Sequence, residues 1–408
     1  MNILFLSHYF PPEGNAPASR VYEFSRRWAA SGNEITVITS APNVPGGVVY
    51  PGYRNRFVRE NQDGIRVQRV WTYLAPNKGT ARRILNYLSY MFSAFFAGLA
   101  GRRPDVVVAT SPQFFCAWAG LLLAICRRRP FVLEIRDIWP ESITAVEAMR
   151  NRAVLNVLEK MEKMLYRRAD AIVTVGEGYR QRLIEKGVPP GKISVVANGV
   201  TMKPGAIGPS ASSELRARWC PDASFVCIYA GTIGMACGLD VVLRAADLLR
   251  RRGRENIHFL LVGDGAHREE LESRSRAMSL RGVIFTGLQK RSDVAAFLNM
   301  ADACLVHLRK TDLFTTVFPS KLLDAAALKR PVILGVEGHA AQMVREADCG
   351  ICIEPENAEQ LADAVLKLAA DPELCRRFGE NGAAYANGHF NADRQAAEYM
   401  ELLTRIVS

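Results

Sequence analysis

Several patterns that would define a class of protein are absent from this chain of 408 residues. No Asp-x-Asp triplet occurs, so no carboxylate pair suggests a metal ion bridging phosphate groups. The first apolar run is not followed by Gly-x-Gly-x-x-Gly, which argues against a nicotinamide-dependent oxidoreductase. No second Cys or His pair lies at zinc-binding distance from the C-x-x-C pair Cys349 and Cys352, so we interpret both as core residues.

The chain also has little that suggests secretion or a membrane span. No signal peptide precedes the first strand, and we expect the nine cysteines to be in a reducing cytoplasm. The apolar run Ile84–Ala100 carries no charge and is at the lower edge of the length needed to cross a bilayer. Basic pairs flank it, and Leu121–Ile125 followed by Arg127–Arg129 repeats the pattern. A helix packed on a sheet, a helix lying in the bilayer interface and a true span are the alternatives.

Negative charge is scarce in the first half only. Residues 1–200 hold 27 Lys and Arg against 15 Asp and Glu, whereas residues 201–408 hold 25 against 26. A basic first half implies an anionic partner, for which nucleic acid, anionic lipid and a phosphorylated acceptor are candidates. Nucleic acid is disfavoured, because the basic residues alternate with long apolar runs. We therefore expect peripheral association with an anionic membrane surface, the inner face of the cytoplasmic membrane.

Apolar runs that alternate with helical patterns predict an α/β fold with two doubly wound, Rossmann-like parallel sheets that face each other across a cleft. The first series begins at Asn2–Leu6, and the pattern restarts at Phe225–Tyr229. Pro204–Ser213 is rich in Gly, Pro and Ser and is interpreted as a linker. The predicted domains are 1–203 and 214–389, with a C-terminal helix, 390–408, packing back on the first domain.

The most informative segment is Phe318–Ile333, which predicts a loop, a helix that opens near Ser320 and a buried strand. Lys321 and Asp324 are three residues apart and share a face in the first turns of that helix. The free N–H groups of a helix start attract anions. A cation and a carboxylate at this position suit the phosphate and the sugar diol of a nucleotide-sugar.

Five segments in this order resemble the retaining glycosyltransferases of the GT-B fold, family 4. Within that family the chain looks like the N-acetyl-L-fucosamine transferases that build bacterial O-antigen or capsule. The resemblance covers essentially the whole chain. It rests on Phe10–Arg20 (FPPEGNAPASR), Glu134–Ser142 (EIRDIWPES), Ala197–Val200 (ANGV), Tyr229–Gly234 (YAGTIG) and Phe318–Ile333.

The resemblance implies donor-binding roles for residues that match the family's motifs. In the first domain these are Gly14 and Asn15 of a glycine loop and the nearby Arg20, although a plain turn and a solvated arginine explain them nearly as well. In the second domain Asp324 matches the carboxylate that binds the ribose. The other donor-binding residues that we infer there are Gly231, Thr232, Gly263, Asp264, Gly265, Gln289, Ser320 and Lys321.

Catalytic roles fall on the segment after the strand that ends near Glu134. If that strand persists, Arg136 lies on the same side as Glu134 and Asp137 lies opposite. Arg136 and Asp137 stand where family members often have a histidine near the transferred sugar. Asp137 or Glu141 could bind the acceptor hydroxyl and take its proton. An ion pair at the end of the strand is the alternative.

The sequence departs from the family at the phosphates. The first glutamate of the family's pair would fall at Thr316, and the usual Arg and Lys would fall near Thr232 and Cys237, where no cation stands. We expect Lys321 to substitute for those cations, with backbone N–H groups beside it and with no metal and no cofactor.

The predicted function is transfer of a sugar from a nucleotide diphosphate donor to a lipid-linked acceptor in the biosynthesis of a surface polysaccharide. The donor is expected to be a UDP-linked N-acetylated deoxyhexosamine such as L-FucNAc, and the acceptor a polyprenyl-diphosphate-linked saccharide. A UDP-sugar 2-epimerase of the same architecture and a non-catalytic scaffold of a polysaccharide assembly complex are the alternatives. An epimerase needs no membrane acceptor, so the amphipathic segment argues against it.

Overall fold

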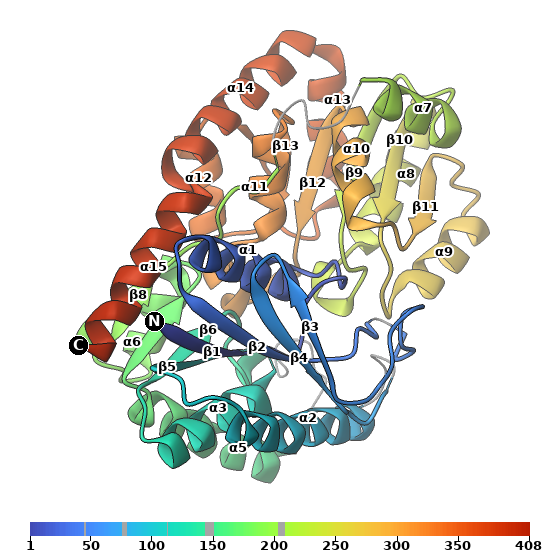
Figure 1. The fold of residues 1–408 in the computed structure, drawn as a ribbon. Coiled ribbons are helices and arrows are strands. Elements are labelled where there is room, and N and C mark those ends of the chain that lie inside the picture. The colour runs from blue at the N-terminus through green and yellow to red at the C-terminus, as the bar shows by residue number, and fades with distance from the viewer. Residues whose placement is uncertain (45, 76–79, 112, 143–150, 203–208) are drawn as a thin grey trace. The chain divides into compact units, whose positions relative to one another are not determined.

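The computed structural model describes residues 1–44, 46–75, 80–111, 113–142, 151–202 and 209–408 (Figure 1). The chain divides into two compact units. Unit 1 comprises Met1–Asn198 together with Ala392–Ser408, and unit 2 comprises Gly199–Asn391. The chain therefore leaves unit 1, forms unit 2 and returns to unit 1 with its last helix.

Unit 1 is built on a sheet of eight strands in the order β3-β4-β2-β1-β5-β6-β7-β8. Every neighbouring pair is parallel except β3 and β4, which are antiparallel. The central strands are apolar and buried on both faces, as parallel sheets require. The strands are β1 (Asn2–Leu6), β2 (Glu34–Ser40), β3 (Val58–Gln62), β4 (Ile65–Val70), β5 (Val106–Thr110), β6 (Phe131–Ile135), β7 (Ala171–Thr174) and β8 (Ile193–Val195).

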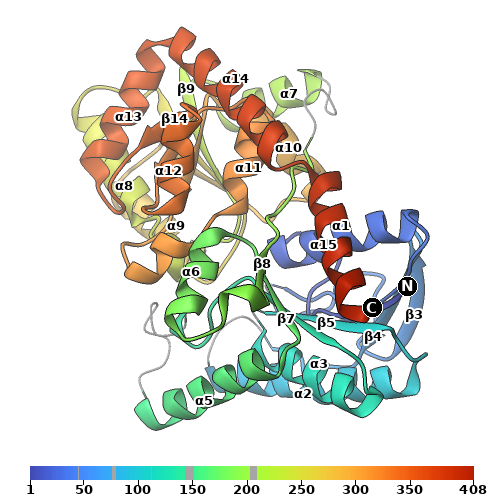
Figure 2. The same cartoon turned by 90° about the vertical axis from the view of Figure 1, so that its left-hand side faces the viewer.

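Helices cover both faces of this sheet (Figure 2). Helices α1 (Ala16–Ala30) and α15 (Ala392–Val407) pack on the face that carries Val106 and Val108. The indole Nε1 of Trp28 donates a hydrogen bond to the carbonyl of Ala396 at 3.0 Å, which joins the two helices. The opposite face carries α2 (Thr80–Ala100), α3 (Phe114–Arg127) and α5 (Arg152–Arg168), and unit 1 also contains α6 (Glu177–Glu185) and the short η1 (Pro190–Lys192).

Unit 2 has a parallel sheet of six strands in the order β11-β10-β9-β12-β13-β14. Its strands are β9 (Phe225–Ala230), β10 (Ile257–Val262), β11 (Val283–Gly287), β12 (Ala303–His307), β13 (Val332–Gly335) and β14 (Gly350–Cys352). One face is covered by α8 (Asp240–Arg251), α9 (Arg268–Ala277) and α13 (Ala358–Ala370). The other is covered by α10 (Arg291–Met300), α11 (Ser320–Ala327) and α12 (His339–Glu346). The remaining elements are α7 (Pro209–Trp219), η2 (Met235–Cys237), η3 (Asp312–Thr316) and α14 (Pro372–His389).

The apolar run Ile84–Ala100 lies within α2, which packs against α3 and against strands β2 and β4. Its inward face buries Tyr90 and Ala94, whereas Leu85, Phe92 and Phe96 are exposed. Among the helices of the described residues, none has the length and apolar character that crossing a bilayer requires. The helix therefore packs on the sheet and still presents apolar side chains on its outer face.

Two local expectations are corrected by the structure. The hairpin formed by β3 and β4 is absent from the predicted strand series, because VRENQ and IRVQRV are too polar to stand out as apolar runs. The prediction of a linker at Pro204–Ser213 is wrong for residues 209–213, because these residues form the start of α7. Residues 203–208, which include the rest of that linker, lie outside the described part of the chain.

We predict that Tyr399→Ala lowers the free energy of unfolding of unit 1 by about 3 kcal/mol or more, because a large buried side chain leaves a cavity. The Tyr399 ring is fully buried and packs edge-on against Trp28 at 5.1 Å and Phe24 at 5.5 Å. Thermal melting measures the loss, with the exposed Phe96→Ala as the matched control. Equal stability of both variants would show that α15 contributes little to unit 1.

Candidate active site

Three loops of unit 2 meet where β9, β10 and β11 end. The N–H of Gly231 donates a hydrogen bond to the carbonyl of Val262 at 2.8 Å. The N–H of Ile233 donates to the carbonyl of Asp264 at 3.0 Å, and that of Gly263 to the carbonyl of Gly287 at 3.1 Å. Ligands of open α/β sheets bind at the carboxyl ends of the strands. We call the segments Gly231–Gly238, Gly263–Arg268 and Gly287–Gln289 the donor loops.

Glycine is required at two positions of the donor loops because their backbones approach closely. A Cβ atom at Gly263 would lie 2.0 Å from the carbonyl oxygen of Gly231. One at Gly265 would lie 2.3 Å from the carbonyl oxygen of Ile233. The segment Gly263-Asp264-Gly265 is therefore more than a turn, since it packs directly on the loop after β9.

Lys321 reaches these loops from the first turn of α11. Its ammonium lies 3.8 Å from the centroid of the Tyr229 ring and donates a hydrogen bond to the Tyr229 hydroxyl. A Cβ atom at Gly231 would lie 2.4 Å from Cε of Lys321, so a larger residue there would displace the end of this side chain. The Tyr229 hydroxyl in turn donates to the carbonyl of Thr232 at 2.7 Å. The loop after β9 and the start of α11 are thus joined through one lysine and one tyrosine.

Burial lowers the pKa of the Lys321 ammonium, and the negative charges that Cys237 and Asp324 can carry only partly oppose this effect. A bound anion would stabilise the charged form and raise the same pKa. Asp324 lies one turn further along α11 and is partly buried. An anion placed near Lys321 would therefore be bound most tightly while the lysine is protonated.

The other predicted donor residues of unit 2 make mainly local contacts. The amide of Gln289 donates to the carbonyl of Thr286 at 2.9 Å, and the Asp264 carboxylate accepts the N–H of Gly265 at 2.8 Å. Ser320 begins α11, whose start has no side-chain cap. Thr316, at the position of the family's first glutamate, donates its hydroxyl to the carbonyl of Leu313 at 2.7 Å.

In unit 1 the loop after β1 is held by two residues that the sequence analysis did not identify. The buried Glu13 carboxylate accepts the N–H groups of Asn43 at 3.0 Å and Val44 at 3.2 Å. Burial raises the pKa of Glu13 to about 7, and these hydrogen bonds oppose the rise. The buried Arg69 guanidinium donates to the carbonyl of Pro11 at 2.7 Å. Glu13 lies within the segment Phe10–Arg20 of the resemblance, but no role was inferred for Glu13 or Arg69, because their partners are distant in sequence.

Gly14 is exposed at the tip of this loop, and Asn15 is the N-cap of α1. The Asn15 side chain accepts the N–H of Ala18 at 2.9 Å. The capping contact explains the residue type at position 15 without a ligand.

The guanidinium of Arg20, for which a donor-binding role is predicted, is occupied by partners inside unit 1. Its Nε forms an ion pair with Glu134 at 3.0 Å, and both side chains are almost completely buried. Its other nitrogens donate to the carbonyls of Val196 at 2.8 Å and Ala197 at 3.0 Å and to the side chain of Asn198 at 3.0 Å. Arg20 therefore joins α1 to β6 and to the segment after β8.

The segment after β6 places Arg136 and Asp137 at the carboxyl edge of the unit 1 sheet. The strand ends at Ile135, so the expected alternation of sides does not extend to these residues. Nε and Nη1 of Arg136 are buried and have no hydrogen-bond partner among the described residues. Burial lowers the pKa of Arg136 to about 10, although the Glu134 charge opposes this shift. An anionic group would satisfy these donors.

Asp137 has the properties of a group that exchanges a proton near neutral pH. Burial raises its pKa to about 6, and hydrogen bonds from Ser142 and Ile138 oppose the rise. Glu141 differs, because it forms ion pairs with Lys186 at 2.7 Å and Arg182 at 3.0 Å. Burial alone would raise the pKa of Glu141, but the hydrogen bonds and charges of these two cations lower it. The ion-pair alternative therefore fits Glu141, and Asp137 is the better candidate for a base.

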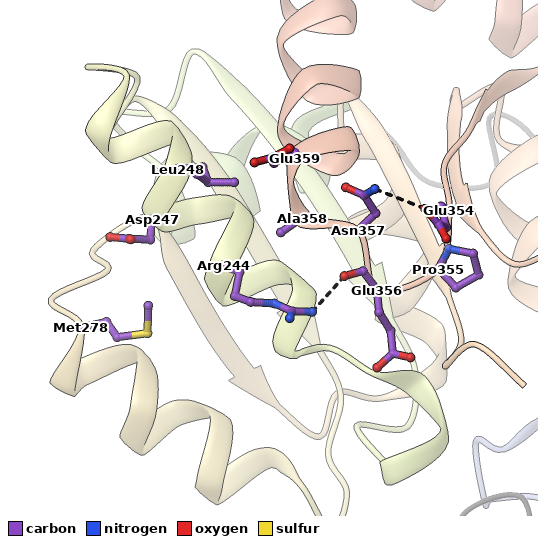
Figure 3. A pocket seen from close by; sticks show the side chains of 10 residues that line it. All are labelled: Arg244, Asp247, Leu248, Met278, Glu354, Pro355, Glu356, Asn357, Ala358 and Glu359. Atoms are coloured by element: carbon purple, nitrogen blue, oxygen red, sulfur yellow. Dashed lines mark hydrogen bonds between the residues drawn. The ribbon is translucent and has the colours of Figure 1, made fainter.

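Figure 3 shows a separate pocket of about 550 Å³ in unit 2, between α8 and the start of α13. Arg244 donates to the carbonyl of Glu356 at 2.9 Å at its edge. The pocket shares no residue with the donor loops or with Lys321. Its lining residues are Arg244, Asp247, Leu248, Met278, Glu354, Pro355, Glu356, Asn357, Ala358 and Glu359.

Glycine loops and a cation at the carboxyl ends of a parallel sheet are typical of α/β proteins that bind nucleotides. Comparison with known families is consistent with this class. Residues 15–199 match the description "Glycosyl transferase 4-like domain", and residues 215–385 match "Glycosyl transferases group 1". Together these matches cover most of both units.

The chain is 27% identical over 393 residues to WcaI of Escherichia coli K12, whose name assigns it as a glycosyl transferase to colanic acid biosynthesis. The alignment covers 93% of this chain and 96% of WcaI. The fold is similar to sucrose-phosphate synthase from Thermosynechococcus elongatus, with a TM-score of 0.78, 18% identity and coverage of 99% and 98% of the two chains. It is also similar to Anabaena HepE in complex with UDP-glucose, with a TM-score of 0.74, 16% identity and 99% coverage of both chains.

The chain belongs to the family 4 glycosyltransferases of the GT-B fold, and it is an enzyme of the hexosyltransferase type. The resemblance inferred from its motifs is confirmed at this level. Among the described residues, no group of three or more His, Cys, Asp and Glu side chains is placed to hold a metal ion.

We predict that Arg20→Gln destabilises unit 1 by about 3 kcal/mol or more, because it leaves the buried Glu134 without its cation. Arg26→Gln is the control, since Arg26 pairs with Glu23 on a partly exposed helix surface. Thermal melting and UDP titration are measured for both variants. A stable Arg20→Gln protein that had lost UDP binding would instead restore the donor role of Arg20.

Proposed function

We propose that the enzyme transfers a sugar from a UDP-linked donor to a polyprenyl-diphosphate-linked saccharide during surface polysaccharide biosynthesis. The similarity to WcaI supports this biosynthetic context. The structural similarity to a UDP-glucose complex supports a nucleotide-sugar donor. The motif resemblance favours an N-acetylated deoxyhexosamine such as L-FucNAc, and transfer with retention of the anomeric configuration.

The position of Lys321 is the observation that carries the donor assignment. Its ammonium contacts the loop after β9, where uncharged residues, Thr232 and Cys237, stand near the positions of the family's usual phosphate-binding cations. The N–H groups at the start of α11 lie in the same turn as Lys321. In the proposed complex the ammonium and these N–H groups hold the diphosphate, and Asp324 accepts hydrogen bonds from the ribose.

The same groups assist the reaction, because the diphosphate gains negative charge as its bond to the anomeric carbon breaks. A buried cation stabilises this charge more than a solvated one does. The acceptor oxygen forms the new bond to the anomeric carbon and loses its proton. That proton passes to Asp137, or to the departing phosphate oxygen, and UDP leaves.

We also propose that unit 1 binds an anionic membrane surface through α2, α3 and α5. These three helices lie on one face of the unit 1 sheet (Figure 2). They expose apolar side chains beside basic ones, which suits the boundary between headgroups and acyl chains. The exposed apolar residues are Leu85, Phe92, Phe96, Leu122, Ile125, Val154, Val157 and Met164, and exposed basic residues of this layer include Arg82, Arg128, Lys160, Lys163, Arg167 and Arg168.

We predict that Lys321→Met weakens UDP binding by about tenfold or more, because a charge-assisted hydrogen bond is lost. Lys310→Met is the matched control, since Lys310 is exposed and pairs with Glu354, which is outside the donor loops. Isothermal titration calorimetry with UDP measures both. Unchanged UDP affinity in Lys321→Met would contradict the donor site.

The wild-type affinity for UDP should also fall as pH rises through the lowered pKa of Lys321, since the neutral amine attracts the diphosphate less. In Lys321→Met this part of the pH dependence should disappear. Calorimetry in buffers of different ionisation enthalpy detects the proton taken up on binding. A pH dependence that survives the substitution would assign the effect to another group.

We predict that Asp137→Asn lowers the transfer rate by about a hundredfold or more, the scale of general-base catalysis. Stability at pH 8 should be unchanged or higher. At that pH the Asp137 carboxylate is ionised in both the folded and the unfolded protein. Because its pKa is raised in the folded protein, ionisation destabilises the folded state relative to the unfolded one. Thermal melting measures the change in stability, and an assay of transfer to a lipid-linked acceptor measures the change in rate. Full transfer activity would remove Asp137 from the mechanism, and donor consumption without acceptor would favour an epimerase.

A further inference from the structure

Unit 1 exposes three aromatic side chains around the hairpin of β3 and β4. Phe57 is 50% exposed, Trp71 52% and Tyr73 40%. Three exposed arginines accompany them on the β3 side of the hairpin. We call the six residues the hairpin patch: Arg54, Arg56, Phe57, Arg59, Trp71 and Tyr73.

The two segments that carry the hairpin patch are tied side by side. The Asn55 amide donates to the carbonyl of Thr72 at 2.7 Å and accepts the N–H of Thr72 at 3.0 Å. The next residues continue as the antiparallel pair in which Val58 faces Arg69. The Arg59 guanidinium lies 5.3 Å from the centroid of the Phe57 ring. The aromatic rings and the arginines therefore occupy one end of the hairpin.

The side chains of the hairpin patch have no evident role in stabilising unit 1. None of Arg54, Arg56 and Arg59 has an ion-pair partner among the described residues, whereas the next arginine along the hairpin, Arg66, pairs with Glu34 at 2.9 Å. Large apolar surface beside unpaired positive charge marks a binding surface. Aromatic rings beside arginines can bind an amphiphile, because the rings contact its apolar chain and the arginines bind its anionic head group.

The hairpin patch lies at the ligand-binding edge of the sheet. Strand β4 is parallel to β2, β1, β5 and β6, so Trp71 follows β4 at the same edge where Arg136 and Asp137 follow β6. Four strand spacings separate β4 from β6, which is roughly 19 Å. One extended ligand could therefore reach from the hairpin patch to Asp137.

The hairpin patch also adjoins α2. The N–H of Tyr73 donates to the hydroxyl of Ser89 at 2.8 Å, and the Asn86 amide donates to the carbonyl of Tyr73 at 2.6 Å. Helix α2 carries Leu85, Phe92 and Phe96 on its exposed face. A lipid that leaves the proposed membrane face would meet the hairpin patch next.

We propose that the hairpin patch binds the diphosphate and the first isoprene units of the lipid-linked acceptor. This inference rests on the proposed function and assigns to it a part of the acceptor site. The arginines bind the diphosphate, since guanidinium matches phosphate geometry, and the aromatic rings cover the isoprenyl chain. The distance to Asp137 then leaves room for the acceptor's sugars between its diphosphate and the reacting hydroxyl.

The test uses farnesyl diphosphate, a short prenyl diphosphate, as the probe for the full-length protein. Calorimetry should show that it binds more tightly than farnesol or inorganic diphosphate, because the hairpin patch recognises both parts. Trp71→Ala and the double variant Arg54→Gln, Arg56→Gln should each weaken binding by about tenfold or more. Val407→Ala, in an exposed apolar residue of α15 that belongs to neither the hairpin patch nor the proposed membrane face, is the control and should leave it unchanged.

Two results would overturn the inference. One is farnesyl diphosphate affinity that is the same in wild type, Trp71→Ala and the double arginine variant. The other is loss of binding to phosphatidylglycerol vesicles in these variants with farnesyl diphosphate binding intact, which would make the hairpin patch a general membrane contact. UDP titration of the same proteins separates this inference from the proposed function. UDP binding without any effect of the variants on the prenyl probe rejects the inference alone, whereas a wild type that binds no UDP rejects the proposed function.

Discussion

The buried ammonium of Lys321, which lies over the Tyr229 ring and against Gly231, is the interaction on which the donor site depends. A desolvated cation without a full set of hydrogen bonds is costly, which the lowered pKa of Lys321 reflects. A bound anion would offset that cost, which is why we propose that the diphosphate of the donor binds here. The glycine loops, which pack backbone on backbone, hold this cation at the carboxyl ends of the strands.

Unit 1 uses buried charge for two purposes. The pair of Arg20 and Glu134 is fully enclosed and joins α1, β6 and the segment after β8, which is a structural use. Two and three residues after Glu134, Arg136 and Asp137 are half-buried and lack comparable ion pairs among the described residues, and their pKa values shift toward neutrality. Neighbouring charged residues can thus differ in role, according to whether the fold supplies them with ion-pair and hydrogen-bond partners.

The sequence predicted the elements that depend on local pattern. Most of the apolar strands of both sheets and the helix start at Ser320 followed from short segments. Contacts between distant segments did not. The pairing of Arg20 with Glu134, the support of the glycine loop by Glu13 and Arg69, and the Tyr229 ring under Lys321 join residues 30 to 114 positions apart. The hairpin of β3 and β4 was missed because its strands are polar and lie at the edge of the sheet.

Hydrogen–deuterium exchange with and without UDP tests the central claim most directly, because it reports where on the chain the nucleotide binds. The account predicts slower exchange in peptides that contain Gly231–Gly238, Gly263–Arg268 and the start of α11 at Ser320–Asp324. UDP binding that leaves these three segments unchanged would contradict it and would place the donor elsewhere in the enzyme.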